Sequence, residues 1–380
     1  MASHDNLPLV SSPTLILTVP TDSERDRIWR ATHPHWGAAV TIDDYVERET
    51  TLLDAPLARN GGLTPWMLTD GNLAPDSRPI LSSFETYRKR ALVADKNGAV
   101  KEVTSYGVAS VFTFTECRGK GYASKMMALF SQQLRAAQEK KNGDAGLSVL
   151  WSDIGKDFYN SLGWKPFQST YLEFPTIKSS LVPDGNLKLI SFEDLPSLAA
   201  QDEKLLRNTI SKPASKARAV ILPDLDTLQW HLIREDYMCK YIFSRTPAIR
   251  GAIYTPPDAP NSRVWAIWSR AFYGGLAKPE KNTLYFLRLV IENEDISDEE
   301  LAKGIQAIVS VAQQEAPEWK CTKAEIWNPT ERVKKVAEGI EELGAKFKVR
   351  EKDNLASLQW FGDGSVDEVE WVACEKYAWC

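Results

Sequence analysis

Apolar and polar positions along the chain follow two periods, one typical of strands and one typical of helices. Short apolar runs predict strands, whereas apolar stripes at three- and four-residue spacing predict helices. In the first half the predicted strands are Leu15–Val19, Trp66–Thr69, Ile80–Val93, Val103–Thr115, Leu147–Ser152 and Phe167–Phe174. The predicted helices of that half are Asp22–Thr32, Ile42–Leu53, Ala123–Lys140 and Lys156–Leu162. The two longest strands are expected to form a bent antiparallel pair.

The pattern is interrupted at Pro175–Asn186, a stretch with two prolines, a glycine, two serines and no periodicity. Such a composition predicts a linker. We therefore expect one domain at residues 1–175, a linker at 176–186 and a second domain at 187–380.

The second domain shows a similar order of elements. Its predicted strands are Leu187–Ile190, Gly251–Tyr254, Val264–Phe272, Leu284–Ile291, Ala324–Trp327, Leu358–Phe361 and Val369–Tyr377, and its predicted helices are Leu195–Ile210, Asp226–Phe243, Asp298–Ala316 and Glu331–Leu343. The fold class predicted for both domains is mixed α/β (α+β).

Composition and charge narrow the class of protein. Apolar residues make up 43% and charged residues 26% of the 380 positions, which is typical of a packed globular protein. The net charge of −5 disfavours nucleic acid or an anionic membrane as a partner and is compatible with a cationic substrate. Five scattered cysteines without a C-x-x-C pair indicate neither a disulfide framework nor a metal site. With no apolar run long enough to span a membrane and no secretory signal, a cytoplasmic protein is expected.

The loop Arg118–Ala123 carries the clearest chemical signal. Its sequence fits the pattern Arg/Gln-x-x-Gly-x-Gly/Ala, which arises by chance about 0.4 times in a chain of this length. The predicted strand before the loop and the predicted helix after it make a chance match less plausible. Glycines allow close backbone approach to an anion, and a helix N-terminus favours negative charge, so the loop predicts a pyrophosphate site. Two other phosphate-binding loops fit less well. A Walker loop needs Gly-Lys-Ser/Thr, whereas Lys120-Gly121 has the reverse order. A dinucleotide-binding fingerprint follows a first parallel strand, whereas the strand before this loop is the fourth.

A second motif lies in the run Leu150–Trp164, LWSDIGKDFYNSLGW. Together with the loop it resembles the GNAT superfamily of N-acetyltransferases. Read with Phe84–Arg88 and Val111–Met127, it is most similar to the fungal lysine N6-acetyltransferase family. These motifs occupy about residues 80–175, and Phe114 departs from the superfamily pattern, where proline is common.

This resemblance implies a splayed, mostly antiparallel sheet that binds acetyl-coenzyme A. The second domain is then a GNAT-like copy that has lost the phosphate loop, with Leu301–Gly304 in its place, and that walls the acceptor cleft. The residues implied in coenzyme binding are Val111, Phe112, Thr113, Arg118, Gly119, Lys120, Gly121, Tyr122, Ala123, Ser124 and Asn160.

The resemblance also frames the catalytic candidates. Tyr159 is the predicted donor to the leaving thiolate, because a tyrosine hydroxyl donates from a rigid ring. Glu85 is the predicted base that takes the amine proton, directly or through water; the alternative is a solvent-facing glutamate paired with Arg88 or Lys89. Asp153 is a second candidate, or an N-cap of the following helix. His33 and His35 are interpreted as packing or capping groups, and the C-terminal carboxylate of Cys380 as a further possible base.

The resulting hypothesis is acetyl transfer from acetyl-coenzyme A to the ε-amine of free L-lysine, by direct attack in a ternary complex. The acceptor rests on the family resemblance alone. The alternatives are another amine, such as a polyamine or a protein N-terminus, and a catalytically silent coenzyme-binding scaffold. Arg270 and Arg288, on predicted strands, are interpreted as surface charges, with bidentate binding of a substrate carboxylate as the alternative.

Overall fold

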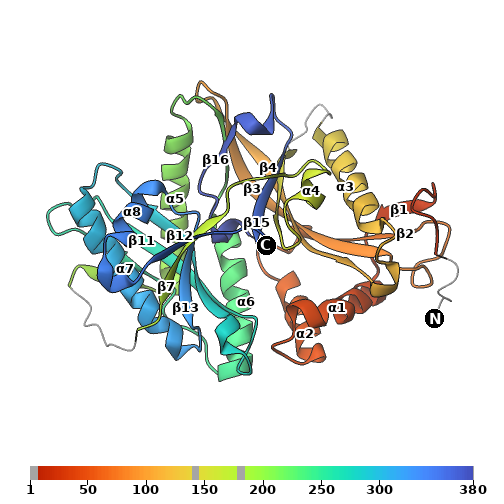
Figure 1. Ribbon diagram of the computed structural model, residues 1–380, viewed down its shortest axis with the longest axis horizontal. Helices are drawn as coiled ribbons and strands as arrows, with labels where there is room; N and C mark the ends of the chain where they lie inside the picture. The colour runs from red at the N-terminus through yellow and green to blue at the C-terminus, as the bar shows by residue number, and fades with distance from the viewer. Residues whose placement is uncertain (1–6, 139–144, 178–184, 380) are drawn as a thin grey trace.

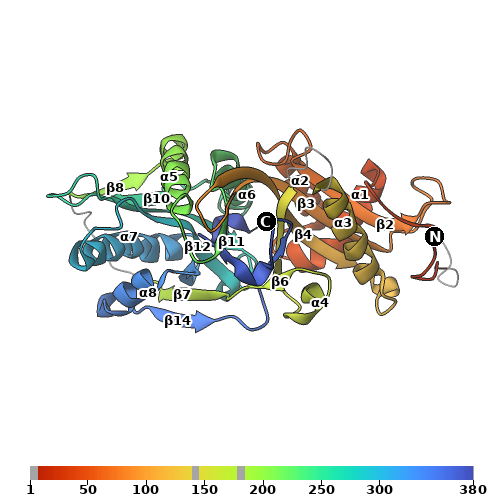
Figure 2. The ribbon, with the colours of Figure 1, turned by 90° about the horizontal axis from the view of Figure 1, so that it is seen from above.

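The computed structural model describes residues 7–138, 145–177 and 185–379. Two twisted sheets lie side by side with helices on their faces, and the last described residues of the chain lie between them (Figure 1). The view from above shows the same arrangement (Figure 2). The predicted mixed α/β fold with mostly antiparallel sheets is confirmed.

The first sheet has the strand order β1-β2-β3-β4-β5-β15-β6. Its strands are β1 (Leu15–Thr18), β2 (Leu63–Asp70), β3 (Ser82–Ala94), β4 (Val100–Thr113), β5 (Ala145–Ser152), β15 (Leu355–Trp360) and β6 (Lys165–Pro166), and β9 (Ala217–Ile221) joins β3 and β16 (Val369–Trp371). The helices of this half are α1 (Asp22–Trp36), α2 (Ile42–Leu53), α3 (Tyr122–Gln138) and α4 (Asp157–Asn160). The pair β4 and β5, joined through α3, is parallel.

The second sheet has the order β14-β7-β13-β12-β11-β10-β8. Its strands are β8 (Leu187–Ile190), β10 (Gly251–Tyr254), β11 (Val264–Phe272), β12 (Asn282–Ile291), β13 (Lys323–Trp327), β7 (Thr170–Pro175) and β14 (Lys346–Val349). The helices are α5 (Leu195–Ile210), α6 (Leu225–Phe243), α7 (Asp298–Glu318) and α8 (Glu331–Glu338). Here β12 and β13, joined through α7, form the parallel pair. The second sheet therefore repeats the topology of the first.

Each half contributes strands to the sheet of the other: the C-terminal half adds β9, β15 and β16 to the first sheet, and β7 of the N-terminal half joins the second. Strand β15, from the C-terminal part, pairs with β5 in the first sheet. Strand β7, which precedes the expected linker, pairs with β13 in the second sheet. Neither sheet is therefore built from one continuous half of the chain. The predicted domains at 1–175 and 187–380 stay a prediction. This exchange ties both halves into one hydrogen-bonded framework.

Several predicted elements differ from the structure. Helix α1 continues through Pro34 to Trp36, because a proline in the last turn removes only one hydrogen bond. The run predicted as a strand at Phe167–Phe174 begins only at Thr170, where β7 starts, and residues 167–169 belong to no strand. Helix α8 ends at Glu338 and a short 3-10 turn follows, so the predicted helix was too long.

The predicted strand Val369–Tyr377 was also wrong beyond Trp371. Ala373 has a φ of 50°, which ends the strand, and Lys376–Ala378 form a 3-10 turn. This segment is buried, and Lys89 Nζ donates to the Ala378 carbonyl at 2.9 Å. The strands β9 and β14 were not predicted. β14 is largely exposed, so it lacks the alternating apolar pattern.

The C-terminal segment around Glu375 occupies the gap that opens in the second sheet where the parallel strands β12 and β13 separate. Pairing of β12 with β13 ends at Phe286 and Ile326. Just beyond that point the Glu375 carboxylate accepts the Leu289 N–H at 2.8 Å and pairs with Arg288. The corresponding gap in the first sheet stays open and forms the cavity described next.

Candidate active site

The parallel strands of the first sheet separate at their ends. Pairing between β4 and β5 stops at Val108 and Leu150, although β4 continues to Thr113. Strand β5 instead keeps β15 as its partner on the other side. A cavity of about 550 Å³ opens at this separation. The splayed sheet predicted from the sequence is therefore present.

A β-bulge shapes the floor of the cavity. The register of β3 against β4 shifts between Ser83 and Glu85, so that β4 carries one extra residue. Within the bulge, Ser110 has a φ of 54° and its hydroxyl donates to Glu85 Oε2 at 2.9 Å. A bulge interrupts the ladder of backbone bonds locally. Val111, Phe112 and Thr113 follow it and all line the cavity, and their role in coenzyme binding stays a prediction.

The Arg118–Ala123 loop lies at one end of the cavity, where Arg118 and Ala123 line it. Gly119 and Gly121 have φ of 73° and 83°, conformations that favour glycine. A Cβ added at Gly119 would meet no atom within 4 Å, so the backbone there is open to a ligand. Helix α3 begins at Tyr122, and its first N–H groups have no partner within the helix. These features fit the pyrophosphate of a coenzyme A thioester.

The other predicted loop residues differ in exposure. Lys120 and Ser124 are exposed, whereas Tyr122 is buried and donates its hydroxyl to the Pro8 carbonyl at 2.5 Å. Tyr122 therefore anchors the N-terminal segment against α3 through its side chain. Asn160 is exposed on α4 and does not line the cavity among the described residues.

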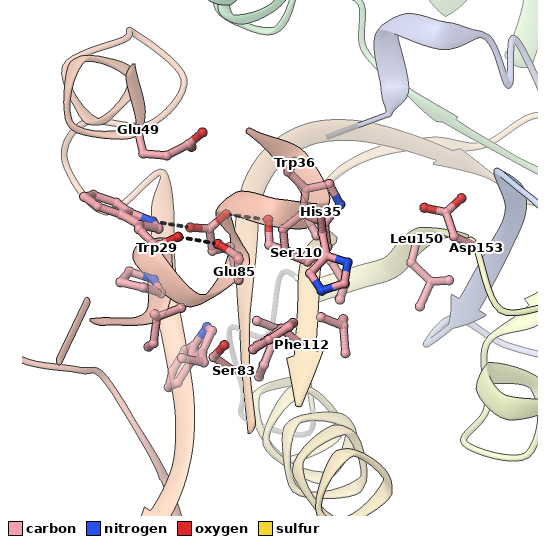
Figure 3. Close-up of a pocket in the computed structure, with 18 of the residues that line it drawn as sticks. Trp29, His35, Trp36, Glu49, Ser83, Glu85, Ser110, Phe112, Leu150 and Asp153 are labelled. Carbon is pink, nitrogen blue, oxygen red and sulfur yellow. Dashed lines mark hydrogen bonds between the residues drawn. The ribbon is translucent and has the colours of Figure 1, made fainter. Parts of the chain in front are cut away.

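Glu85 is held inside the cavity by two hydrogen bonds. Trp29 Nε1 donates to Oε1 at 3.3 Å and Ser110 donates to Oε2 (Figure 3). Burial, with the nearby negative charge of Glu49, raises the pKa of Glu85 to about 7, against the smaller opposing effect of its hydrogen bonds. The solvent-facing alternative does not describe this side chain, since it pairs with neither Arg88 nor Lys89 in the structure. A carboxyl group with this pKa exchanges protons readily at neutral pH.

Tyr159 and Asp153 come from the opposite wall. Tyr159 is 7% exposed and lines the cavity, and burial raises the pKa of its hydroxyl, with a smaller contribution from Asp153. The tyrosine therefore stays protonated and can donate. Asp153 does not cap α4; its carboxylate accepts the Asn354 N–H at 2.9 Å. Figure 3 shows Asp153 well away from Glu85, on the side of the cavity where Leu150 lies.

Helices α1 and α2 close the cavity on the side of Glu85. The two histidines of α1 differ: His33 Nε2 bonds the Val40 carbonyl at 2.9 Å, whereas His35 lines the cavity and packs on Phe112 with ring centroids 5.6 Å apart. The packing and capping interpretation of both residues agrees with these contacts. On α2, Glu49 is paired with Arg48.

The second half contributes a wall that sequence reasoning did not identify residue by residue. Its lining residues are Trp230 and Arg234 of α6, Tyr273 after β11, and Trp379 near the C-terminus. No local motif marks these positions, because they are brought together only by the packing of the two halves. The predicted role of Cys380 lies outside the described residues.

The described residues contain neither a metal-binding cluster nor a membrane-spanning helix. Within residues 7–138, 145–177 and 185–379, no group of three or more His, Cys, Asp or Glu side chains is arranged to hold a metal ion. No helix in the same part of the chain is long and apolar enough to cross a membrane.

The architecture is shared with solved structures of the GNAT class of N-acetyltransferases. A protein of unknown function from Enterococcus faecalis V583, described as a probable N-acyltransferase, superposes with a TM-score of 0.54 at 13% identity, covering 92% of this chain and 72% of that one. A GCN5-related N-acetyltransferase from Kribbella flavida superposes with a TM-score of 0.50 at 16% identity, covering 91% and 72%. At these identities the likeness shows the fold, which is the GNAT fold.

The sequence comparison gives the family. Residues 171–380, more than half of the chain, match the model described as the LYC1 GNAT-like C-terminal domain, and the chain belongs to this family. A lysine acetyltransferase of Yarrowia lipolytica is 29% identical over 261 residues, which are 58% of this chain and just 65% of that protein. An uncharacterized protein of Saccharomyces cerevisiae is 20% identical over 382 residues, covering 90% of this chain and 92% of that protein. Together with the fold, these matches show a GNAT-like protein.

Proposed function

We propose that the protein transfers the acetyl group of acetyl-coenzyme A to the ε-amine of free L-lysine. The observation that carries the proposal is one cavity that is lined both by the glycine-bearing Arg118–Ala123 loop and by the half-buried carboxylate of Glu85. The lysine acceptor rests on the name of the Yarrowia relative.

The donor side is formed by the loop and by the open end of β4. Backbone N–H groups of Gly119, Gly121 and the first turn of α3 are the proposed donors to the pyrophosphate. The helix N-terminus adds a partial positive charge that favours binding of this anion. The unpaired edge of β4 after Val108 offers backbone groups to the pantetheine amides. A backbone N–H in Val111–Thr113 is the proposed donor to the oxyanion. This arrangement leaves the thioester between β4 and β5.

The acceptor amine must lose a proton before it attacks. With a pKa of about 10.4, only about one lysine in 2,500 is neutral at pH 7, a cost of roughly 4.6 kcal/mol. Glu85, with a pKa of about 7, accepts this proton directly or through water. The amine then attacks the carbonyl carbon, the C–S bond breaks, and the thiolate takes a proton. No residue of the chain becomes acetylated in this scheme.

Tyr159 is the proposed donor to the departing thiolate, and we expect Tyr159→Phe to lower kcat by about 100-fold, the lower range of general acid catalysis. The KM for acetyl-coenzyme A is expected to change little, because the loop that binds the pyrophosphate is untouched. Steady-state thiol release measures both constants. Tyr241→Phe, at an exposed position of α6, is the matched control. If Tyr159→Phe kept more than half of the wild-type kcat, another donor would be required.

Two alternatives remain for the function, and one experiment separates them. Thiol release from acetyl-coenzyme A is measured with L-lysine, spermidine and a peptide with a free N-terminus. The proposal expects L-lysine to be acetylated with the highest kcat/KM. Turnover of spermidine or of the peptide without turnover of L-lysine would overturn the acceptor. Binding of the coenzyme without turnover of any amine would favour a scaffold.

A further inference from the structure

One arginine in the cavity has neither a hydrogen-bond partner nor an ion-pair partner within the described residues. Four arginines line the described cavity walls. Arg25 pairs with Asp22, Arg48 pairs with Glu49, and Arg118 Nε donates to the Thr113 carbonyl. Arg234 is half-buried, and no described residue forms a hydrogen bond or ion pair with it; its guanidinium carbon lies 5.9 Å from the centre of the Tyr273 ring.

The packing of α6 fixes where Arg234 lies. Trp230 and Arg234 are one turn apart and therefore share a face of the helix, and both line the cavity. Asp224 caps the helix by accepting the Thr227 N–H at 3.0 Å. Towards the other end, the Tyr237 hydroxyl donates to the Asp44 carbonyl of α2 at 3.0 Å. The helix that carries Arg234 is thus held firmly against the first half.

A half-buried guanidinium without an anion loses hydration and gains no ion pair in return. Its planar fork matches a carboxylate, which it binds through two parallel hydrogen bonds. The first-half wall of the same cavity carries the carboxylates Glu49 and Glu85. The cavity therefore presents negative charge from one half of the molecule and a free positive charge from the other. A ligand with an amine at one end and a carboxylate at the other complements both.

We propose that Arg234 binds the carboxylate of the acceptor, so that the enzyme selects a free amino acid over a polyamine or a lysine within a protein chain. This inference rests on the proposed function, since it takes the cavity as the acceptor site. Arg234 acts on the choice of acceptor and takes no part in the proton transfer at Glu85.

The test compares amines that differ only at the carboxylate. kcat/KM is measured for L-lysine, L-lysinamide and cadaverine with wild-type protein and with Arg234→Gln. We expect Arg234→Gln to lower kcat/KM for L-lysine by about 10- to 100-fold, mainly through KM, as for loss of hydrogen bonds to a charged group. The two acceptors that lack a carboxylate should change by less than about threefold. Arg234→Lys keeps the positive charge but loses the planar fork, so its kcat/KM for L-lysine should lie between those of the wild type and Arg234→Gln.

Lys240→Gln removes a positive charge from an exposed position of the same helix outside the cavity and should leave all three acceptors unaffected. An equal loss for L-lysine and cadaverine in Arg234→Gln would overturn the inference. The same ligands are also titrated calorimetrically with coenzyme A present. If the wild type failed to acetylate lysine, the proposed function would fail, while preferential binding of carboxylate ligands that disappears in Arg234→Gln would still uphold the role of Arg234.

Discussion

Replacing Glu85 with glutamine is expected to lower kcat by about 100- to 1,000-fold, within the usual range for loss of a general base. The amide is nearly the same size; its oxygen can still accept from Trp29 Nε1, and its NH2 group can donate to the Ser110 hydroxyl, so the cavity should keep its shape. Binding of acetyl-coenzyme A, measured by calorimetry, should change little. Glu116→Gln, at an exposed position beside the loop, is the matched control.

The pH profile distinguishes a base from a merely structural glutamate. Only the deprotonated carboxylate accepts a proton, so kcat/KM of the wild type should rise with pH and level off above the Glu85 pKa of about 7. This rising limb of the pH profile should be missing in Glu85→Gln. In Glu49→Gln it should move to lower pH, because the charge that raises the Glu85 pKa is lost and Arg48 is left unpaired. An unchanged limb in Glu85→Gln would rule out Glu85 as the titrating base.

Replacing Arg288 with methionine is expected to lower the free energy of unfolding by about 3–5 kcal/mol. Arg288 is buried and pairs with two buried carboxylates, Asp202 at 2.8 Å and Glu375. Without it both carboxylates are left in a poorly hydrated interior. Urea unfolding followed by fluorescence measures the change. Arg30→Met, which breaks exposed pairs with Asp26 and Asp43, should cost less than about 1 kcal/mol.

The loss in Arg288→Met should shrink as the pH falls. Unpaired burial raises the folded-state pKa of a carboxyl above its unfolded value, so protonation at lower pH favours the folded state. The pKa of Glu375 is already raised by burial in the presence of Arg288. We therefore expect a smaller deficit at pH 5 than at pH 8. A deficit no larger than that of Arg30→Met at either pH would show that the pair contributes little.

The local sequence predicted the elements that build the donor side. The loop Arg118–Ala123 is recognisable because glycine positions and the strand before them are read within a few residues, and Gly119 and Gly121 do adopt positive φ. Tyr159 was found through a motif of consecutive positions on α4. Glu85 was identified only as a carboxylate in mid-strand, and its environment could not be predicted, because Trp29 and Ser110 are far from it in sequence.

Other errors have the same origin. Arg288 was interpreted as a surface charge, since arginine is rarely buried unless paired. Its partners Asp202 and Glu375 lie 86 and 87 positions away. The C-terminal segment was predicted as a strand from its apolar residues, and it instead occupies the gap beside β12.

The sequence by itself therefore determined the two-sheet α/β class, most helices and strands, and the glycine loop that fits a coenzyme. These depend on periodicity and on short motifs, which act over a few residues. Only the tertiary structure decided which strands are exchanged, that the gap of the second sheet is filled while that of the first is open, and that Arg234 faces the same cavity as Glu85. Those features depend on contacts between residues more than eighty positions apart, and no local pattern encodes them.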